Sequence, residues 1–116
     1  MTQIRGLDAV VLIVKDLEKQ KAFYQEVLGL ELEADYGDAL FFKLGDQKLA
    51  LFARSHHPQG TQRLEGAPKG LSHLEFRVSA KDRERLEQRL RDQGFHAYTD
   101  NFEDADGNLF HFNSEK

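Results

Sequence analysis

One segment near the middle of the chain places a histidine, a glutamate and an arginine at alternate positions. His73, Glu75 and Arg77 are separated by apolar residues within the run 73–78. If this run is a strand, the three polar side chains lie on one face, about 6.6 Å from one to the next, because alternate side chains point to opposite faces. Imidazole nitrogens and carboxylate oxygens coordinate divalent ions, and all three groups can orient polar atoms of a small molecule. The row is therefore a candidate binding site.

A second histidine near the C-terminus fits the same pattern. His111 stands between Phe110 and Phe112. A strand here sends both phenylalanines to the core, and it sends His111 and Asn113 to the opposite face. We expect this face and the face that carries His73 to border the same space.

The elements that must position these residues follow from an internal repeat. Residues 6–14 align with residues 70–78 at an offset of 64, with glycine and leucine at the start of both segments and valine at the end. Each segment leads into a stretch of helical pattern that ends at a glycine, Gly29 in the first copy and Gly94 in the second. The chain is therefore predicted to consist of two half-length modules, each of which begins with a strand and a helix.

The two predicted helices have recognisable ends. Asp16 is a suitable N-cap for the first helix, because its carboxylate can accept a backbone N–H of the first turn. Ser79, followed three residues later by Asp82, resembles a capping box at the start of the second. Gly29 and Gly94 suit the left-handed conformation that ends a helix.

Three strands are predicted after the first helix, near 30–34, 40–44 and 48–53, with turns at Tyr36-Gly37-Asp38 and Gly45-Asp46-Gln47. The second module has shorter candidates, at 95–98, around 102–103 and at 109–113. We expect one domain over residues 1–116, with module one at 1–53, a linker at 54–69 that contains both prolines, and module two at 70–116. The adjacent pair His56-His57 lies in this linker and is interpreted as an exposed turn, because neighbouring side chains do not converge on one ion.

Composition excludes several classes of function. The net charge is −4 and both signs are scattered along the chain, whereas nucleic-acid binders usually carry a clustered basic face. There is no cysteine, so disulfides and thiolate metal sites are excluded. No apolar run approaches the roughly 20 residues of a membrane span. We expect a cytoplasmic protein with neither nucleic acid nor membrane as a partner.

Two groups of residues resemble one known family. The first is Val14-Lys15-Asp16-Leu17, followed by Ala22-Phe23-Tyr24 and Val27-Leu28-Gly29-Leu30, and the second is Asp104-Ala105-Asp106-Gly107-Asn108. In this order and at this spacing they resemble a module of the vicinal oxygen chelate superfamily, which contains glyoxalase I, bleomycin-resistance proteins and extradiol dioxygenases. The resemblance covers nearly the whole chain. It implies an α+β fold of two βαβββ modules, whose mixed sheets curl around a concave cavity, commonly within a homodimer.

The resemblance also implies where a metal would be held. In metal-using members, each module contributes one ligand from its first strand and one from its last, typically His and Glu. The matching positions here hold Ala9 and His73 in the first strands, and Ala50 and His111 in the last. Two of the four positions therefore carry a methyl group, which cannot coordinate an ion.

Two functional predictions remain open. In the first, the chain is a metal-free module that binds a small molecule in the cavity of a homodimer; Phe41, Phe52 and Tyr98 form the apolar part of the site, and His73, Glu75, Arg77 and His111 orient polar groups of the ligand. In the second, His73 and His111, with Glu75, hold a divalent metal ion, and the protein is a lyase, isomerase or transferase acting on a vicinal-oxygen substrate. Glu75 is then also the candidate catalytic group for proton transfer.

A structural role would explain the same residues without any function. Glu75 and Arg77 can form an ion pair on an exposed sheet face, which contributes less than about 1 kcal/mol. His111 can be a hydrogen-bonded histidine of the sheet. The contacts of Glu75, Arg77 and His111 in three dimensions distinguish these structural roles from a role in binding.

Overall fold

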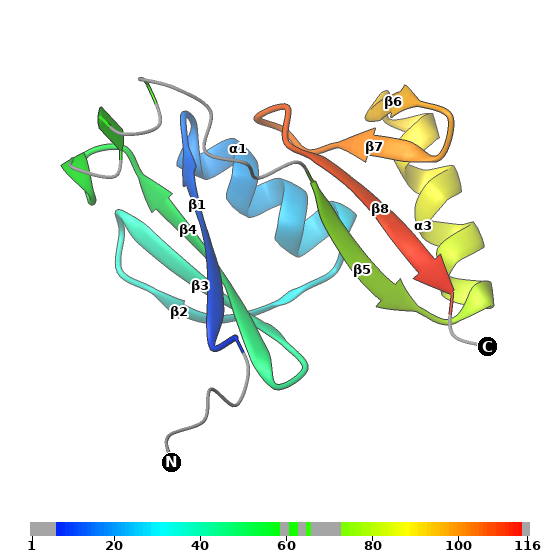
Figure 1. The fold of residues 1–116 in the computed structure, drawn as a ribbon, viewed down its shortest axis with the longest axis horizontal. Coiled ribbons are helices and arrows are strands. Elements are labelled where there is room, and N and C mark those ends of the chain that lie inside the picture. The colour runs from blue at the N-terminus through cyan, green and yellow to red at the C-terminus, as the bar shows by residue number, and fades with distance from the viewer. Residues whose placement is uncertain (1–6, 59–60, 63–64, 66–72, 115–116) are drawn as a thin grey trace, which may run out of the picture.

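Two four-stranded mixed sheets form the framework in a computed structural model of the chain, which describes residues 7–58, 61–62, 65 and 73–114. The first sheet has the order β1-β4-β3-β2 and the second has the order β5-β8-β7-β6 (Figure 1). Their bounds are β1 Ala9–Val14, β2 Glu31–Asp35, β3 Ala39–Leu44, β4 Gln47–Ala53, β5 Leu74–Val78, β6 His96–Tyr98, β7 Asn101–Glu103 and β8 Leu109–Ser114.

Strand connectivity is the same in the two sheets. The first and last strands of each module, β1 with β4 and β5 with β8, pair in parallel, while the remaining neighbours are antiparallel. This arrangement confirms the predicted α+β fold of two βαβββ modules. Part of the predicted linker, and the start of the predicted second module at 70–72 with the glycine of the repeat, lie outside the described residues.

The helices begin and end where the capping residues predict. Helix α1 (Leu17–Ala22) starts with the backbone N–H of Lys19 donating to Asp16 Oδ1 at 3.1 Å, and α3 (Ala80–Asp92) starts with that of Asp82 donating to Ser79 Oγ at 3.1 Å. The glycines that follow the helices, Gly29 and Gly94, have φ values of 75° and 80°. Only glycine adopts this conformation without strain.

The first helix differs from the prediction in its second half. After α1 the chain continues as a π-helical turn, η1 (Phe23–Val27), in which the backbone N–H of Leu28 donates to Phe23 O. The turn buries Phe23, Tyr24 and Val27 together. The sequence could not indicate this change, because the spacing of these three residues suits an ordinary α-helix equally well.

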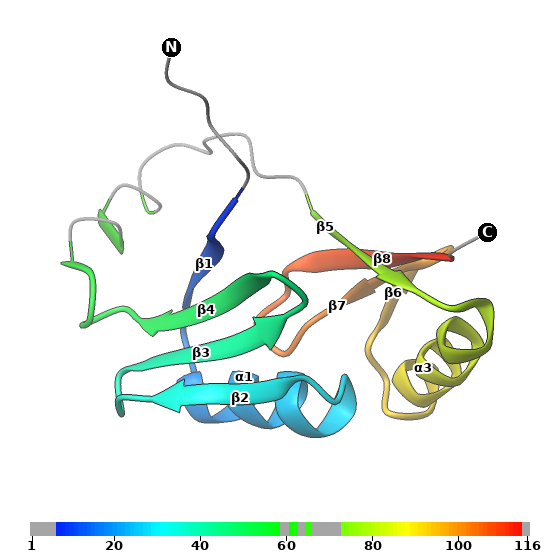
Figure 2. The same ribbon diagram turned by 90° about the horizontal axis from the view of Figure 1, so that it is seen from below.

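Both modules contribute to one continuous core. Phe23 packs edge-on against Phe95 and Phe110 of the second module, with ring centroids 4.7 and 5.9 Å away, while Tyr24 contacts Phe42 of the first sheet. Figure 2 shows α1 and α3 on the same side of the two sheets. Neither α1 nor α3 covers the opposite side.

A buried carboxylate joins the two modules. Asp104 Oδ2, in the turn before β8, accepts hydrogen bonds from Gln20 Nε2 at 2.9 Å and from the Tyr24 hydroxyl at 2.7 Å. Its Oδ1 accepts the backbone N–H groups of Asp106 and Asn108, both at 2.9 Å. Burial, together with the nearby charge of Asp104, raises the pKa of Tyr24. The oxygen of the buried Gln20 amide, Oε1, has no hydrogen-bond partner among the described residues.

Candidate metal and ligand site

Strand alternation places the candidate site on the side of the second sheet that points away from α3. Phe110 and Phe112 are buried in the core, as predicted, and His111 between them is half-buried on the other face. His73 directly precedes β5, and Glu75 lies within it. The parallel register of β5 and β8 pairs Glu75 with His111.

The three side chains converge on a small volume. Glu75 Oε2 lies 2.9 Å from His73 Nε2, and Glu75 Oε1 lies 3.4 Å from His111 Nε2. The two imidazole rings are 5.1 Å apart between centroids. One ligand atom from each residue lies within 4.8 Å of the others. The carboxylate therefore sits between two imidazole nitrogens that both face it.

A fourth residue of the same face holds the carboxylate in place. Asn113 Nδ2 donates a hydrogen bond to Glu75 Oε1 at 2.8 Å. This bond, followed by the one to His73, lowers the pKa of the Glu75 carboxyl. The carboxylate is therefore anionic at neutral pH. Alternation predicted that Asn113 shares this face, but its bond to Glu75 depends on the strand register, which the sequence pattern does not reveal.

The donor set fits a divalent ion. Two imidazole nitrogens and one carboxylate oxygen suit first-row metals such as Zn²⁺, Mn²⁺ and Fe²⁺, and three protein ligands leave coordination positions for a small molecule. The side chains of His73, Glu75 and His111 are partly exposed, so the site is accessible from solvent.

The first sheet holds no such donor set at the equivalent positions. β1 pairs with β4 so that Val11 stands opposite Ala50, as Glu75 stands opposite His111 in the second sheet. Ala50 is fully buried, whereas Val11 is 46% exposed. This register supports the alignment of Ala50 with His111 that the sequence suggested.

The other predicted site residues are more dispersed. Phe41 and Phe52 form a half-buried pair on the first sheet, with ring centroids 6.0 Å apart. Tyr98 is 73% exposed and lies on β6, the edge strand farthest from β5 in the second sheet. The structure therefore does not bring Tyr98 to the histidine cluster. Arg77 is exposed on β5 and forms no ion pair with Glu75.

The histidine pair of the predicted linker has a local role. His56 and His57 are both exposed. His56 Nδ1 lies 3.0 Å from Asp38 Oδ2, and its ring packs against Phe52. Neither histidine belongs to the cluster of metal donors found among the described residues.

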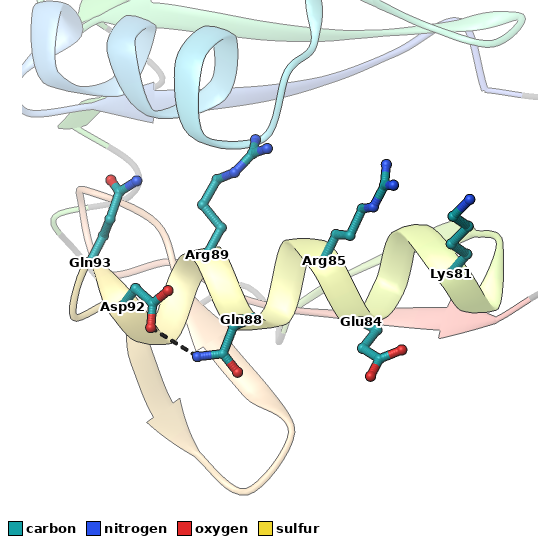
Figure 3. Close-up of a pocket in the computed structure, with 7 residues that line it drawn as sticks. All are labelled: Lys81, Glu84, Arg85, Gln88, Arg89, Asp92 and Gln93. Atoms are coloured by element: carbon teal, nitrogen blue, oxygen red, sulfur yellow. Dashed lines mark hydrogen bonds between the residues drawn. The ribbon is translucent and has the colours of Figure 1, made fainter.

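Among the described residues, one cleft borders the histidine cluster and another lies away from it along α3. A cleft of about 530 Å³ is lined by Leu44–Gln47 of the β3–β4 hairpin and by Glu75–Arg77 of β5. A larger, open cleft of about 850 Å³ runs along α3 (Figure 3). One of its residues, Arg89, donates a hydrogen bond to the carbonyl oxygen of Val27 at 2.9 Å and so caps the C-terminal end of η1.

Comparison with known proteins agrees with this architecture. The family model described as Glyoxalase/Bleomycin resistance protein/Dioxygenase superfamily matches residues 6–112. The chain is 28% identical over 109 residues to glutathione transferase FosA of Serratia marcescens, covering 94% of this chain and 73% of that protein. No helix in the described residues is long and apolar enough to cross a membrane.

Solved structures share the fold at lower identity. A variant of the fosfomycin resistance protein FosX from Listeria monocytogenes, complexed with Mn(II) and 1S,2S-dihydroxypropylphosphonic acid, superposes with a TM-score of 0.74 at 21% identity, covering 98% of this chain and 95% of that one. Lactoylglutathione lyase from Agrobacterium tumefaciens superposes with a TM-score of 0.65 at 22% identity, covering 96% and 94%.

Proposed function

Because this chain belongs to the Glyoxalase/Bleomycin resistance protein/Dioxygenase superfamily, we propose that it is a metal-dependent transferase or lyase whose divalent ion is held by His73, Glu75 and His111. The convergence of these three donors within 4.8 Å carries the proposal. An ion pair between Glu75 and Arg77, the structural alternative, does not form. Relatives that are named as a transferase and a lyase support the reaction class.

Each residue of the site has a distinct role in this proposal. His73 and His111 would supply neutral nitrogen ligands through Nε2, and Glu75 would supply an anionic oxygen ligand. The bound ion would act as a Lewis acid toward an oxygen of the substrate. Asn113 donates to Glu75 Oε1 and so orients the carboxylate between the two histidines. Glu75 is therefore assigned to metal binding, in preference to proton transfer.

A metal-free binding protein is the second candidate. It is favoured by Ala9 and Ala50 at two positions where metal-using relatives carry ligands, and by the aromatic pair of Phe41 and Phe52 on the first sheet. In this case the same polar cluster orients the ligand without an ion.

Both candidates involve a homodimer. Val11 and Leu109 are 46% and 40% exposed on the sides of the sheets that face away from α1 and α3. A second copy that packs against these sides would remove both side chains from water. Sedimentation equilibrium at micromolar concentration tests this part of the proposal, and a monomer alone would contradict it. A cytoplasmic location, suggested by the cysteine-free sequence, belongs to the same proposal.

Metal titration of chelator-treated protein distinguishes the two candidates. We expect Zn²⁺, Ni²⁺, Mn²⁺ or Fe²⁺ to bind at one ion per chain and to raise the unfolding temperature, with about 2.7 kcal/mol of stabilisation at a free ion concentration 100 times Kd. His73→Ala and His111→Ala should each remove this response. His96→Ala is the matched control, because His96 is an exposed histidine on β6 that lies outside the donor cluster, with its ring beside Thr99 and Phe102. An identical response in all four proteins, or none in the native one, would favour the metal-free candidate.

A further inference from the structure

The cleft between the β3–β4 hairpin and β5 shares a residue with the proposed metal site. Glu75 lines this cleft of about 530 Å³ and is also the carboxylate between the two histidines. The volume lies within the range of about 300–1,000 Å³ that is usual for small-molecule sites. A ligand in the cleft would therefore lie directly beside the histidine cluster.

Two opposite charges line this cleft without neutralising each other. Asp46 comes from the hairpin turn and Arg77 from β5. Neither side chain forms an ion pair or a hydrogen bond with another described residue. The third charge of the cleft, Glu75, is already engaged by His73, His111 and Asn113. Asp46 and Arg77 are thus the two charged groups of the cleft that remain available to a ligand.

We propose that the cleft binds a zwitterionic ligand, an amino acid or short peptide, whose carboxylate contacts Arg77 and whose ammonium group contacts Asp46. A guanidinium group binds a carboxylate through two parallel hydrogen bonds, and a carboxylate accepts hydrogen bonds from an ammonium group. A ligand that carried only negative charge would meet repulsion from Asp46, and one that carried only positive charge would meet repulsion from Arg77. A ligand with both charges can pair with Arg77 and with Asp46 at the same time.

The proposal adds a substrate or co-substrate class to the proposed function, and it rests on that function only for placing the ligand beside a metal ion. Glu75 and Arg77 occupy alternate positions of β5, so their side chains leave the same face of the strand about 6.6 Å apart. A zwitterion bound at Arg77 would therefore lie beside Glu75.

The test is a calorimetric titration of chelator-treated protein with alanine, dialanine and trialanine, which separate the two charges by increasing distances. N-acetylated and C-amidated forms of each compound carry only one of the charges. We expect at least one zwitterion to bind saturably, and both of its blocked forms to bind about tenfold more weakly or worse, because each has lost a charged hydrogen-bonding partner. Equal affinity for the zwitterion and its blocked forms, or no saturable binding by any zwitterion, would overturn the proposal.

Variants separate this proposal from the metal site. Arg77→Ala and Asp46→Asn should weaken zwitterion binding about tenfold or more and should leave the response to metal ions intact. Arg85→Ala, which removes an exposed arginine of α3 outside the cleft, should change neither. His73→Ala should abolish metal binding and leave zwitterion binding to metal-free protein unchanged. Zwitterion binding that is insensitive to both Arg77→Ala and Asp46→Asn would place the ligand elsewhere and refute the assignment.

Discussion

Replacement of Asp104 by alanine is expected to destabilise the whole molecule, because its carboxylate joins the two modules. The substitution leaves the Tyr24 hydroxyl and the Gln20 amide buried and without their shared acceptor. Each buried polar group that loses its partner costs about 1–3 kcal/mol. The two together therefore lower the free energy of unfolding by about 2–6 kcal/mol. For a domain of this size, 1 kcal/mol corresponds to roughly 4 °C in the unfolding midpoint, so we expect a decrease of about 8–24 °C.

Two further variants test whether the buried bonds cause this loss. Asp104→Asn keeps the shape of the side chain, and rotation of the Gln20 amide lets its unpartnered Oε1 accept from the new amide. Its destabilisation should therefore be smaller than that of Asp104→Ala. Among the described residues, the neighbouring carboxylate of Asp106 accepts one hydrogen bond, from the exposed backbone N–H of Lys15 at 3.3 Å. Asp106→Ala should therefore change stability by no more than about 0.5 kcal/mol.

Urea denaturation followed by circular dichroism measures all three variants. If the free energy of unfolding of Asp104→Ala lies within about 1 kcal/mol of that of the native protein, the buried groups must find other partners or water. The assigned junction between the modules would then be wrong. An equal loss in Asp104→Asn and Asp104→Ala would show that the rotation of Gln20 does not compensate.

The remaining predictions concern pH, metal affinity and the structural role of the site. The pKa of Tyr24 is raised in the folded state, so above about pH 10 the hydroxyl ionises in the unfolded chain before it does in the native protein. The free energy of unfolding should therefore fall there by up to about 1.4 kcal/mol per pH unit. Urea denaturation across this pH range measures the effect, and Tyr24→Phe should lack it. Asn113→Ala should weaken metal binding about tenfold or more in calorimetry, because Glu75 loses the bond that orients it, and unchanged affinity would refute this positioning role. His73→Ala should leave the thermal unfolding midpoint nearly unchanged, since this residue is not part of the core, and a large loss would contradict the assignment of strand faces.

Much of the fold follows from local chemistry that the sequence displays. Asp16 and Ser79 begin the helices as predicted, and Gly29 and Gly94 end them, because capping depends on single residues and their nearest neighbours. The alternation around His111 also assigns strand faces correctly, because side-chain direction within a strand depends only on parity.

The unpredicted features depend on contacts between distant segments. Asp104 lies in a turn that the sequence identified, but its burial against Gln20 and Tyr24 results from the packing of one module on the other. The distance of Tyr98 from β5 was likewise not predictable, because strand order in a sheet is set by tertiary pairing. The bond from Asn113 to Glu75 requires the register of two strands 38 residues apart in sequence.

The two sheets have equivalent strand registers, so each residue of the candidate site can be compared with the residue at the same position of the first sheet. Its positions Ala9, Val11 and Ala50 correspond to His73, Glu75 and His111. Ala50 is fully buried, and a histidine introduced there would overpack its surroundings at a cost of about 1–3 kcal/mol. A donor set in the first sheet would therefore require smaller neighbouring side chains as well as new ligands, so packing as well as residue type confines the candidate site to the second sheet.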